Sequence, residues 1–190
     1  MTITVVNFQY KLPNNAVVIN TTSRSSNWSR GLSPFLLGPI DLYNGFISQN
    51  MENAWQFSKC YEYFLEEDGY PGERYFKWAE AGWNDKFAHR YPMGKGVIPL
   101  YSWWDGEKLS YIEARKKIYI PLYSKAVKNT EAFKQLKEIY KKEEAIYLQD
   151  FDAHNLVPDS FSYDELICNQ NIKFGHAYVL AMMLESKLNG

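Results

Sequence analysis

The segment from Met51 to Lys59 carries the residues whose types and spacing best suit chemistry. At the helical angle of about 100° per residue, Glu52, Gln56 and Lys59 fall on one polar arc opposite a broad apolar stripe. An ordinary amphipathic helix with a solvated polar face accounts for this pattern. Alternatively, a carboxylate and an amine two helical turns apart, about 10 Å along the axis, could bracket a ligand of nucleotide size. Trp55 borders the arc, which favours the second interpretation because Trp is an unusual choice for open solvent.

The other candidate residues are scattered, and each has an ordinary structural alternative. Residues 90–96 form a glycine-flanked basic loop, in which Lys95 and backbone N–H groups could meet a phosphate, although a plain turn fits equally well. Trp104 and the tryptophan before it could stack on a base, or one of them fills the core. Asp150 and Asp152 follow an expected strand, where a carboxylate either faces a cleft or caps a turn.

Histidine and cysteine spacing does not indicate a metal site. His89, His154 and His176 are far apart, and Cys60 and Cys168 form no paired motif. We therefore expect no metal and no other cofactor. Two isolated thiols, with no apparent secretory signal in residues 1–20, predict a reduced, cytoplasmic protein.

Composition limits the class of protein. The chain has 190 residues, 17% of them aromatic, and a formal net charge of −1, which excludes a disordered chain and a uniformly basic nucleic-acid-binding surface. The apolar run Ala177 to Leu184 is too short to span a bilayer, so no membrane association is expected. Residues 107–144 hold ten Lys and Arg against six Asp and Glu; this excess is typical of a solvated helical face, or of a patch that attracts a phosphate-bearing ligand.

Hydrophobic periodicity predicts an α+β, mostly helical single domain over residues 1–190. A small N-terminal β-hairpin is expected from Thr2 to Thr22, around Pro13-Asn14-Asn15, and a short strand at Ala145–Gln149. Residues 23–50 are expected to be a long ordered loop that walls a pocket. The expected helices are Met51–Glu67, Glu73–His89, Tyr111–Asn129, Glu131–Lys142 and Ile172–Leu188.

Several helix ends have local signals. Ser110 with Glu113, and Ser162 with Glu165, have the spacing of a capping box, and Thr130 can cap the helix that follows it. Pro121 is expected to kink its helix or to end it at Ile120.

The order of these motifs resembles the NADAR (YbiA-like) family, small and mostly helical proteins linked to NAD and ADP-ribose metabolism. The resemblance covers roughly residues 17–187. It rests on six pieces in order: Ser26-Asn27-Trp28 with Ser33-Pro34-Phe35; Glu52, Gln56 and Lys59; Gly94-Lys95 before Trp103-Trp104; Lys125 to Leu136; Asp150 or Asp152; and Phe174-Gly175 to Leu184.

The chain departs from the family pattern at several positions. Asn53 stands where the family has His, Lys95 stands in place of Arg, and Ala153-His154-Asn155 replaces a Trp-Gly pair. Residues 69–84 form an insertion. We interpret these departures as a divergent branch; a viral origin, which is left open, would place the protein in the host cytosol.

The resemblance implies an N-glycosidase that cleaves the ribose C1–N bond of an ADP-ribosylated nucleobase, with ADP-ribosyl-guanine in nucleic acid as the leading substrate. It implies a carboxylate role for Glu52 and a proton-donating or nucleophilic role for Lys59, with Asp152, or Asp150 in its place, as a second carboxylate. The residues implied to bind substrate are Arg24, Asn27, Trp28, Gln56, Lys95, Trp104 and Arg115. The alternative function is a non-catalytic binder that sequesters an ADP-ribose-like nucleotide, for example a host-defence signal.

Overall fold

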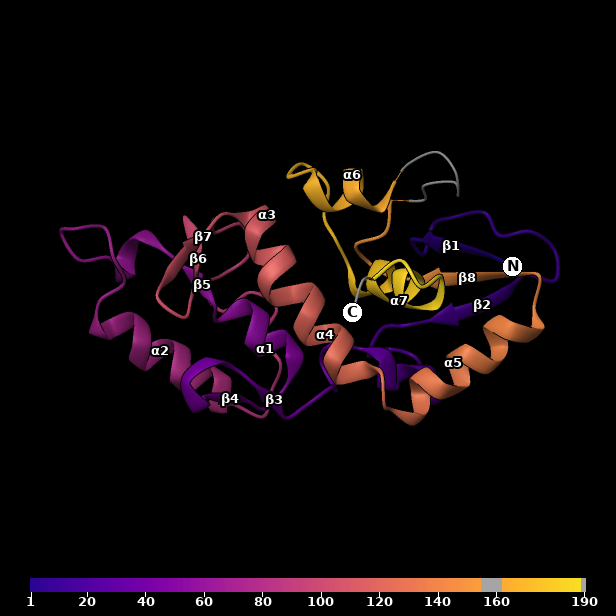
Figure 1. The fold of residues 1–190 in the computed structure, drawn as a ribbon, viewed down its shortest axis with the longest axis horizontal. Helices are drawn as coiled ribbons and strands as arrows, with labels where there is room; N and C mark the ends of the chain where they lie inside the picture. The colour runs from indigo at the N-terminus through magenta and orange to yellow at the C-terminus, as the bar shows by residue number, and fades with distance from the viewer. Residues whose placement is uncertain (155–161, 189–190) are drawn as a thin grey trace. The chain divides into compact units, whose positions relative to one another are not determined.

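The computed structural model describes residues 1–154 and 162–188 and has an α+β fold (Figure 1). Tertiary contacts divide the chain into two compact units. The first unit comprises Met1–Pro34 with Tyr123–Gly190, and the second comprises Phe35–Leu122. Among the described residues, no helix has both the length and the apolar character needed to cross a membrane.

The first unit is built on a three-stranded parallel sheet with a central strand, β8. Its strands are β1 (Thr2–Val6), β8 (Ala145–Gln149) and β2 (Val17–Asn20), in that spatial order (Figure 1). The strand expected at Ala145–Gln149 is confirmed. The expected N-terminal hairpin is wrong, because β1 and β2 do not pair with each other and each runs parallel to β8. The backbone N–H and C=O groups of β1 and β2 therefore pair with a strand that lies far ahead in the sequence.

The helices of the first unit follow local signals closely. They are α4 (Ile120–Val127), which continues from the second unit, α5 (Glu131–Lys142), α6 (Tyr163–Cys168) and α7 (His176–Leu184). The expected bounds of α5 are confirmed, with the Thr130 hydroxyl accepting a hydrogen bond from the Phe133 N–H at 3.1 Å. The capping box of Ser162 and Glu165 begins α6 as predicted. The last helix begins at His176, not Ile172, because residues 169–175 turn through Gly175, whose backbone packs on Asp150.

The second unit combines short helices, short strands and an aromatic core. Its helices are α1 (Met51–Gln56), α2 (Glu73–Asn84) and α3 (Tyr111–Ala114). Its strands are β3 (Ile40–Asp41), β4 (Ile47–Ser48), β5 (Lys59–Cys60), β6 (Tyr101–Trp104) and β7 (Glu107–Leu109). Both β3 and β4 lie within the expected loop 23–50. The β6–β7 hairpin, which we did not predict, turns at Asp105 and Gly106, both at positive φ, as a two-residue hairpin turn requires.

Two expected helices end early. The helix expected at Met51–Glu67 ends at Gln56, since the Ser58 hydroxyl donates to the Trp55 carbonyl at 2.8 Å and the chain then enters β5, which pairs with β6. Lys59 therefore lies on a strand, and the expected helical spacing from Gln56 to Lys59 is wrong. The helix expected at Glu73–His89 ends at Asn84, where extended Asp85 takes the C-cap position.

The helix that begins at Ser110 contains a π turn. Its capping box with Glu113 is confirmed, and Arg115–Tyr119 then form one wide turn in which the Ile120 N–H donates to the Arg115 carbonyl. Of the two outcomes predicted for Pro121, an end of the helix at Ile120 is wrong, because α4 continues to Val127. Pro121 has no N–H to donate and its ring crowds the carbonyl four residues earlier; a wide turn immediately before the proline eases both problems.

Candidate functional site

Glu52, Gln56 and Lys59 form a continuous hydrogen-bonded chain in the second unit. The Gln56 Nε2 donates to Glu52 Oε1 at 2.9 Å, and Lys59 Nζ donates to Gln56 Oε1 at 2.7 Å. This orientation of the amide suits both neighbours, because its N–H end meets the carboxylate and its oxygen meets the ammonium. Glu52 is 6% exposed and Gln56 is 8% exposed, so the solvated-face interpretation is wrong for these two residues. Burying a carboxylate costs free energy unless the group is hydrogen-bonded and paired, and the amide of Gln56 supplies one such hydrogen bond here.

The rings of Trp55, Tyr111 and Tyr119 form an aromatic wall beside these hydrogen-bonded side chains. Lys59 Nζ lies 5.0 Å from the centroid of the Trp55 ring, within the range of a cation–π contact. The Trp55 ring is 5.2 Å from that of Tyr119 and 6.3 Å from that of Tyr111. The wall therefore restricts where the Lys59 ammonium can lie.

Arg115 belongs to the same neighbourhood and is buried on the π turn. Its guanidinium carbon lies 4.2 Å from the centroid of the Tyr111 ring. Two cations, Lys59 and Arg115, thus contact the two adjoining rings of Trp55 and Tyr111. π turns recur at functional sites because the extra residue redirects side chains that an α-helix would align.

Asn53 anchors the helix that holds Glu52 and Gln56. It is fully buried, and its Nδ2 lies within 3.1 Å of the carbonyl oxygens of Gly82, Asp85 and Phe87, while its Oδ1 accepts from the His89 N–H at 2.8 Å. These bonds hold the segment after α2 against α1. The Asn found where the resemblance expects His therefore has a structural role.

Asp150 and His176 form a buried pair in the first unit, at 4% and 5% exposure. His176 Nδ1 lies 3.1 Å from Asp150 Oδ2, and His176 Nε2 lies 2.8 Å from the Thr21 carbonyl oxygen. Both ring nitrogens face acceptors, which favours a doubly protonated imidazolium. Burial alone would raise the pKa of Asp150, but the charge and hydrogen bond of His176, with two backbone N–H groups, lower it to about 2.

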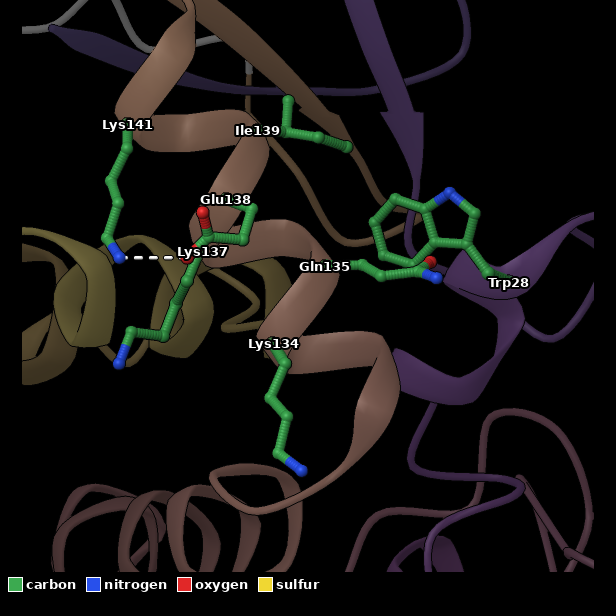
Figure 2. Close-up of a pocket in the computed structure, with 7 residues that line it drawn as sticks. All are labelled: Trp28, Lys134, Gln135, Lys137, Glu138, Ile139 and Lys141. Carbon is green, nitrogen blue, oxygen red and sulfur yellow. Dashed lines mark hydrogen bonds and ion pairs between the residues drawn. The ribbon is translucent and has the colours of Figure 1, made fainter.

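The other candidates of the first unit have separate surroundings. Asp152 is 28% exposed at its side chain, with an oxygen 3.7 Å from Lys173 Nζ. The Arg24 guanidinium carbon lies 5.0 Å from the centroid of the Phe151 ring. The Asn27 side chain accepts from the Ser29 N–H at 2.9 Å and caps a 3₁₀ turn over Trp28–Leu32, and Trp28 lines a hollow along α5 (Figure 2).

The remaining candidates of the second unit lie in loops and hairpins. Lys95 is exposed between Gly94 and Gly96, both at positive φ, and the Trp104 ring centroid is 4.8 Å from that of Tyr43. Of the residues predicted from the sequence, Glu52, Gln56, Lys59 and Arg115 are thus linked through shared neighbours. Arg24, Asn27, Trp28, Asp150 and Asp152 belong to the other unit.

Sequence reasoning missed Tyr111 and Tyr119. With Arg115 they recur every four residues, a spacing that places all three on one face of an α-helix. That pattern was a readable signal of an aromatic and cationic face.

Among residues 1–154 and 162–188, no group of three or more His, Cys, Asp and Glu side chains could hold a metal ion. Asn155, one of the residues that replace the family's Trp-Gly pair, lies outside the described residues. Comparison with known proteins gives no match to any family model, any curated protein or any solved structure.

Proposed function

We propose that the chain is an N-glycosidase of the NADAR (YbiA-like) type. Its substrate would be an ADP-ribosylated nucleobase, with ADP-ribosyl-guanine in nucleic acid as the leading example. The observation that carries the proposal is the hydrogen-bonded chain from buried Glu52 through buried Gln56 to Lys59. Its residue types match the needs of a reaction in which positive charge develops on a sugar and a nitrogen leaves.

The proposed step consumes one water molecule. The bond between ribose C1 and the base nitrogen breaks, the electron pair goes to the nitrogen, and the water oxygen bonds to C1. Glu52 stabilises the positive charge on the sugar and accepts a proton from the water. Lys59 donates a proton to the leaving nitrogen, Glu52 releases the proton from water to solvent, and Lys59 regains one from solvent, so the protein ends unchanged.

Arg115 and the aromatic wall would hold the rest of the ligand. Arg115 lies against the Tyr111 ring, and a planar guanidinium is the type of group that recognises phosphate oxygens. Trp55 and Tyr111 offer ring faces beside it. The ligand class implied by these groups is a sugar nucleotide that carries phosphate.

The test is a turnover assay with ADP-ribosylated guanosine, in which released ADP-ribose is followed over time. The Glu52→Gln variant should lower turnover about 100-fold or more, the scale of a positioned acid–base group. Glu62→Gln is the matched control, because Glu62 is an exposed carboxylate of the same unit. Thermal unfolding of both variants shows whether the fold is kept. Near-normal turnover of a folded Glu52→Gln protein would remove Glu52 from the mechanism.

A second candidate function is a non-catalytic binder of an ADP-ribose-like nucleotide. The burial of Glu52, which already accepts a hydrogen bond from Gln56, favours this reading because it limits the access of water. The same assay separates the two functions. A binder returns intact ligand at a stoichiometric ratio, and its melting temperature rises with ligand concentration.

A further inference from the structure

The first unit carries a second surface with chemistry of its own, a hollow of about 660 Å³ along α5 (Figure 2). One side is the indole of Trp28, which lies beside Gln135 and Ile139. The rest of the lining includes Lys134, Lys137 and Lys141. Figure 2 shows the indole on one flank of α5 and the Lys137 and Lys141 ammonium groups on the other, so a ligand that meets both lies across the helix.

The three lysines are spaced along one side of the helix. Lys134 and Lys141 are seven residues apart, about 10 Å along the axis, with Lys137 between them. In B-DNA each strand carries one phosphate for about every 3.4 Å of axial rise, and a less stacked single strand carries them further apart, so this length faces more than one phosphate. The row therefore matches a polymer better than one isolated phosphate.

The existing partners of these lysines are easily exchanged. Lys134 pairs with Glu131 at 2.6 Å and Lys141 pairs with Glu138 at 2.8 Å, with all four side chains more than half exposed. Exposed pairs of this kind contribute about 0–1 kcal/mol. Within the described part of the chain, the Lys137 side chain makes no hydrogen bond or ion pair. The lysines can therefore turn toward phosphates at little cost.

Trp28 is held in place by its neighbours in sequence. The adjoining Ser29 is buried, and its hydroxyl donates to the Asn20 carbonyl at 2.6 Å and lies 2.8 Å from the Ser25 hydroxyl. The Asn27 cap fixes the same turn. A ring that is fixed before binding loses little conformational freedom when a base stacks on it.

We propose that this hollow binds single-stranded nucleic acid, with a base stacked on Trp28 and the following phosphates along Lys134, Lys137 and Lys141. Bases within a duplex are already stacked on each other and do not offer a free face. An acidic peptide would use the lysines but would gain nothing from the indole. The inference does not depend on the glycosidase proposal, because an unmodified strand lacks the ADP-ribose group that the proposed reaction removes and is bound in the other unit.

The test is fluorescence anisotropy of a labelled twelve-nucleotide DNA with the full chain at low salt. Base–aromatic stacking predicts that Trp28→Ala weakens binding roughly 5- to 150-fold, with a smaller loss for Trp28→Phe. Lys137→Ala should lower the slope of log affinity against log salt by about 0.7. Lys142→Ala is the matched control, since Lys142 lies on the same helix but does not line the hollow, and it should change affinity less.

Three competitors identify what is recognised: an abasic strand of equal length, a duplex, and poly-glutamate. All three should compete poorly with the single strand. Equal binding of the abasic strand, equal binding of poly-glutamate, or unchanged affinity in a folded Trp28→Ala protein would each overturn the proposal. If Trp28→Ala unfolds, the abasic strand and Lys137→Ala still decide the outcome.

Discussion

Replacing Asp150 by Asn should destabilise the protein by about 3–5 kcal/mol at neutral pH. Asp150 accepts hydrogen bonds from the Ala177 and Asp152 N–H groups, each at 3.3 Å, in addition to facing His176. Removing one member of a buried ion pair leaves the other charge uncompensated, which costs about that much. The lowered pKa of Asp150 gives a second, smaller value for this destabilisation, because a change in pKa from 3.8 to about 2 corresponds to about 2.4 kcal/mol.

The assay is urea denaturation followed by tryptophan fluorescence, repeated between pH 7 and pH 2. The folded-state pKa of Asp150 lies below its unfolded value, so its stabilising effect is present above about pH 4 and is lost as the pH falls toward 2. The gap between the wild-type protein and Asp150→Asn should therefore narrow over that interval. Asp152→Asn is the matched control, and its loss should stay below about 1 kcal/mol because that carboxylate is partly exposed.

Two results would refute this reasoning. One is wild-type stability of Asp150→Asn at pH 7. The other is a gap between wild-type and variant that stays constant from pH 5 to pH 2. Either result would mean that the buried pair contributes nothing through its charge.

Three further changes test the second unit. Asn53→Ala should lower the free energy of unfolding by about 2–4 kcal/mol in urea titrations, because it leaves buried backbone groups without partners. Gly82→Ala should cost about 1–3 kcal/mol in the same assay, despite the better helix propensity of Ala, because a Cβ there overlaps the Phe57 ring; an unchanged midpoint would contradict the packing. Ser110→Ala should lower the melting temperature by about 2–4 °C in a calorimetric scan, through loss of about 1 kcal/mol of capping.

Elements with signals inside their own sequence were predictable. The capping boxes at Ser110 and Ser162, the Thr130 cap and all of α5 depend on residues within four positions of each other. β8 was also predicted within its observed bounds. In each case the local pattern and the final fold agree, so no distant contact had to be known.

Elements decided by distant partners were not predictable. β1 and β2 look like a hairpin because they are close in sequence, yet both pair with a strand more than 120 residues further on. Lys59 leaves the helical pattern because it pairs with Ser102. The Asp105-Gly106 turn was different, since that dipeptide is a local hairpin signal, yet no strand was predicted on either side of it.

The candidate site was likewise predictable only where it depends on local sequence. The polar arc of Glu52 and Gln56 was visible in the sequence, but its burial depends on what covers α1. The rings that accompany it come from Tyr111 and Tyr119, more than 50 residues away. The residue types therefore indicated which side chains could take part in a reaction. Tertiary packing determined which other side chains lie beside them.

The central place of β8 has a consequence for synthesis on the ribosome. β2 ends at Asn20 and its partner begins at Ala145, so at about 5–20 residues per second the first two strands wait roughly 6–25 seconds before pairing. The second unit is one uninterrupted stretch and emerges completely during that delay. In a nascent chain the second unit should therefore fold first. The apolar residues of β1 and β2 should remain exposed and accessible to chaperones until translation has passed Gln149.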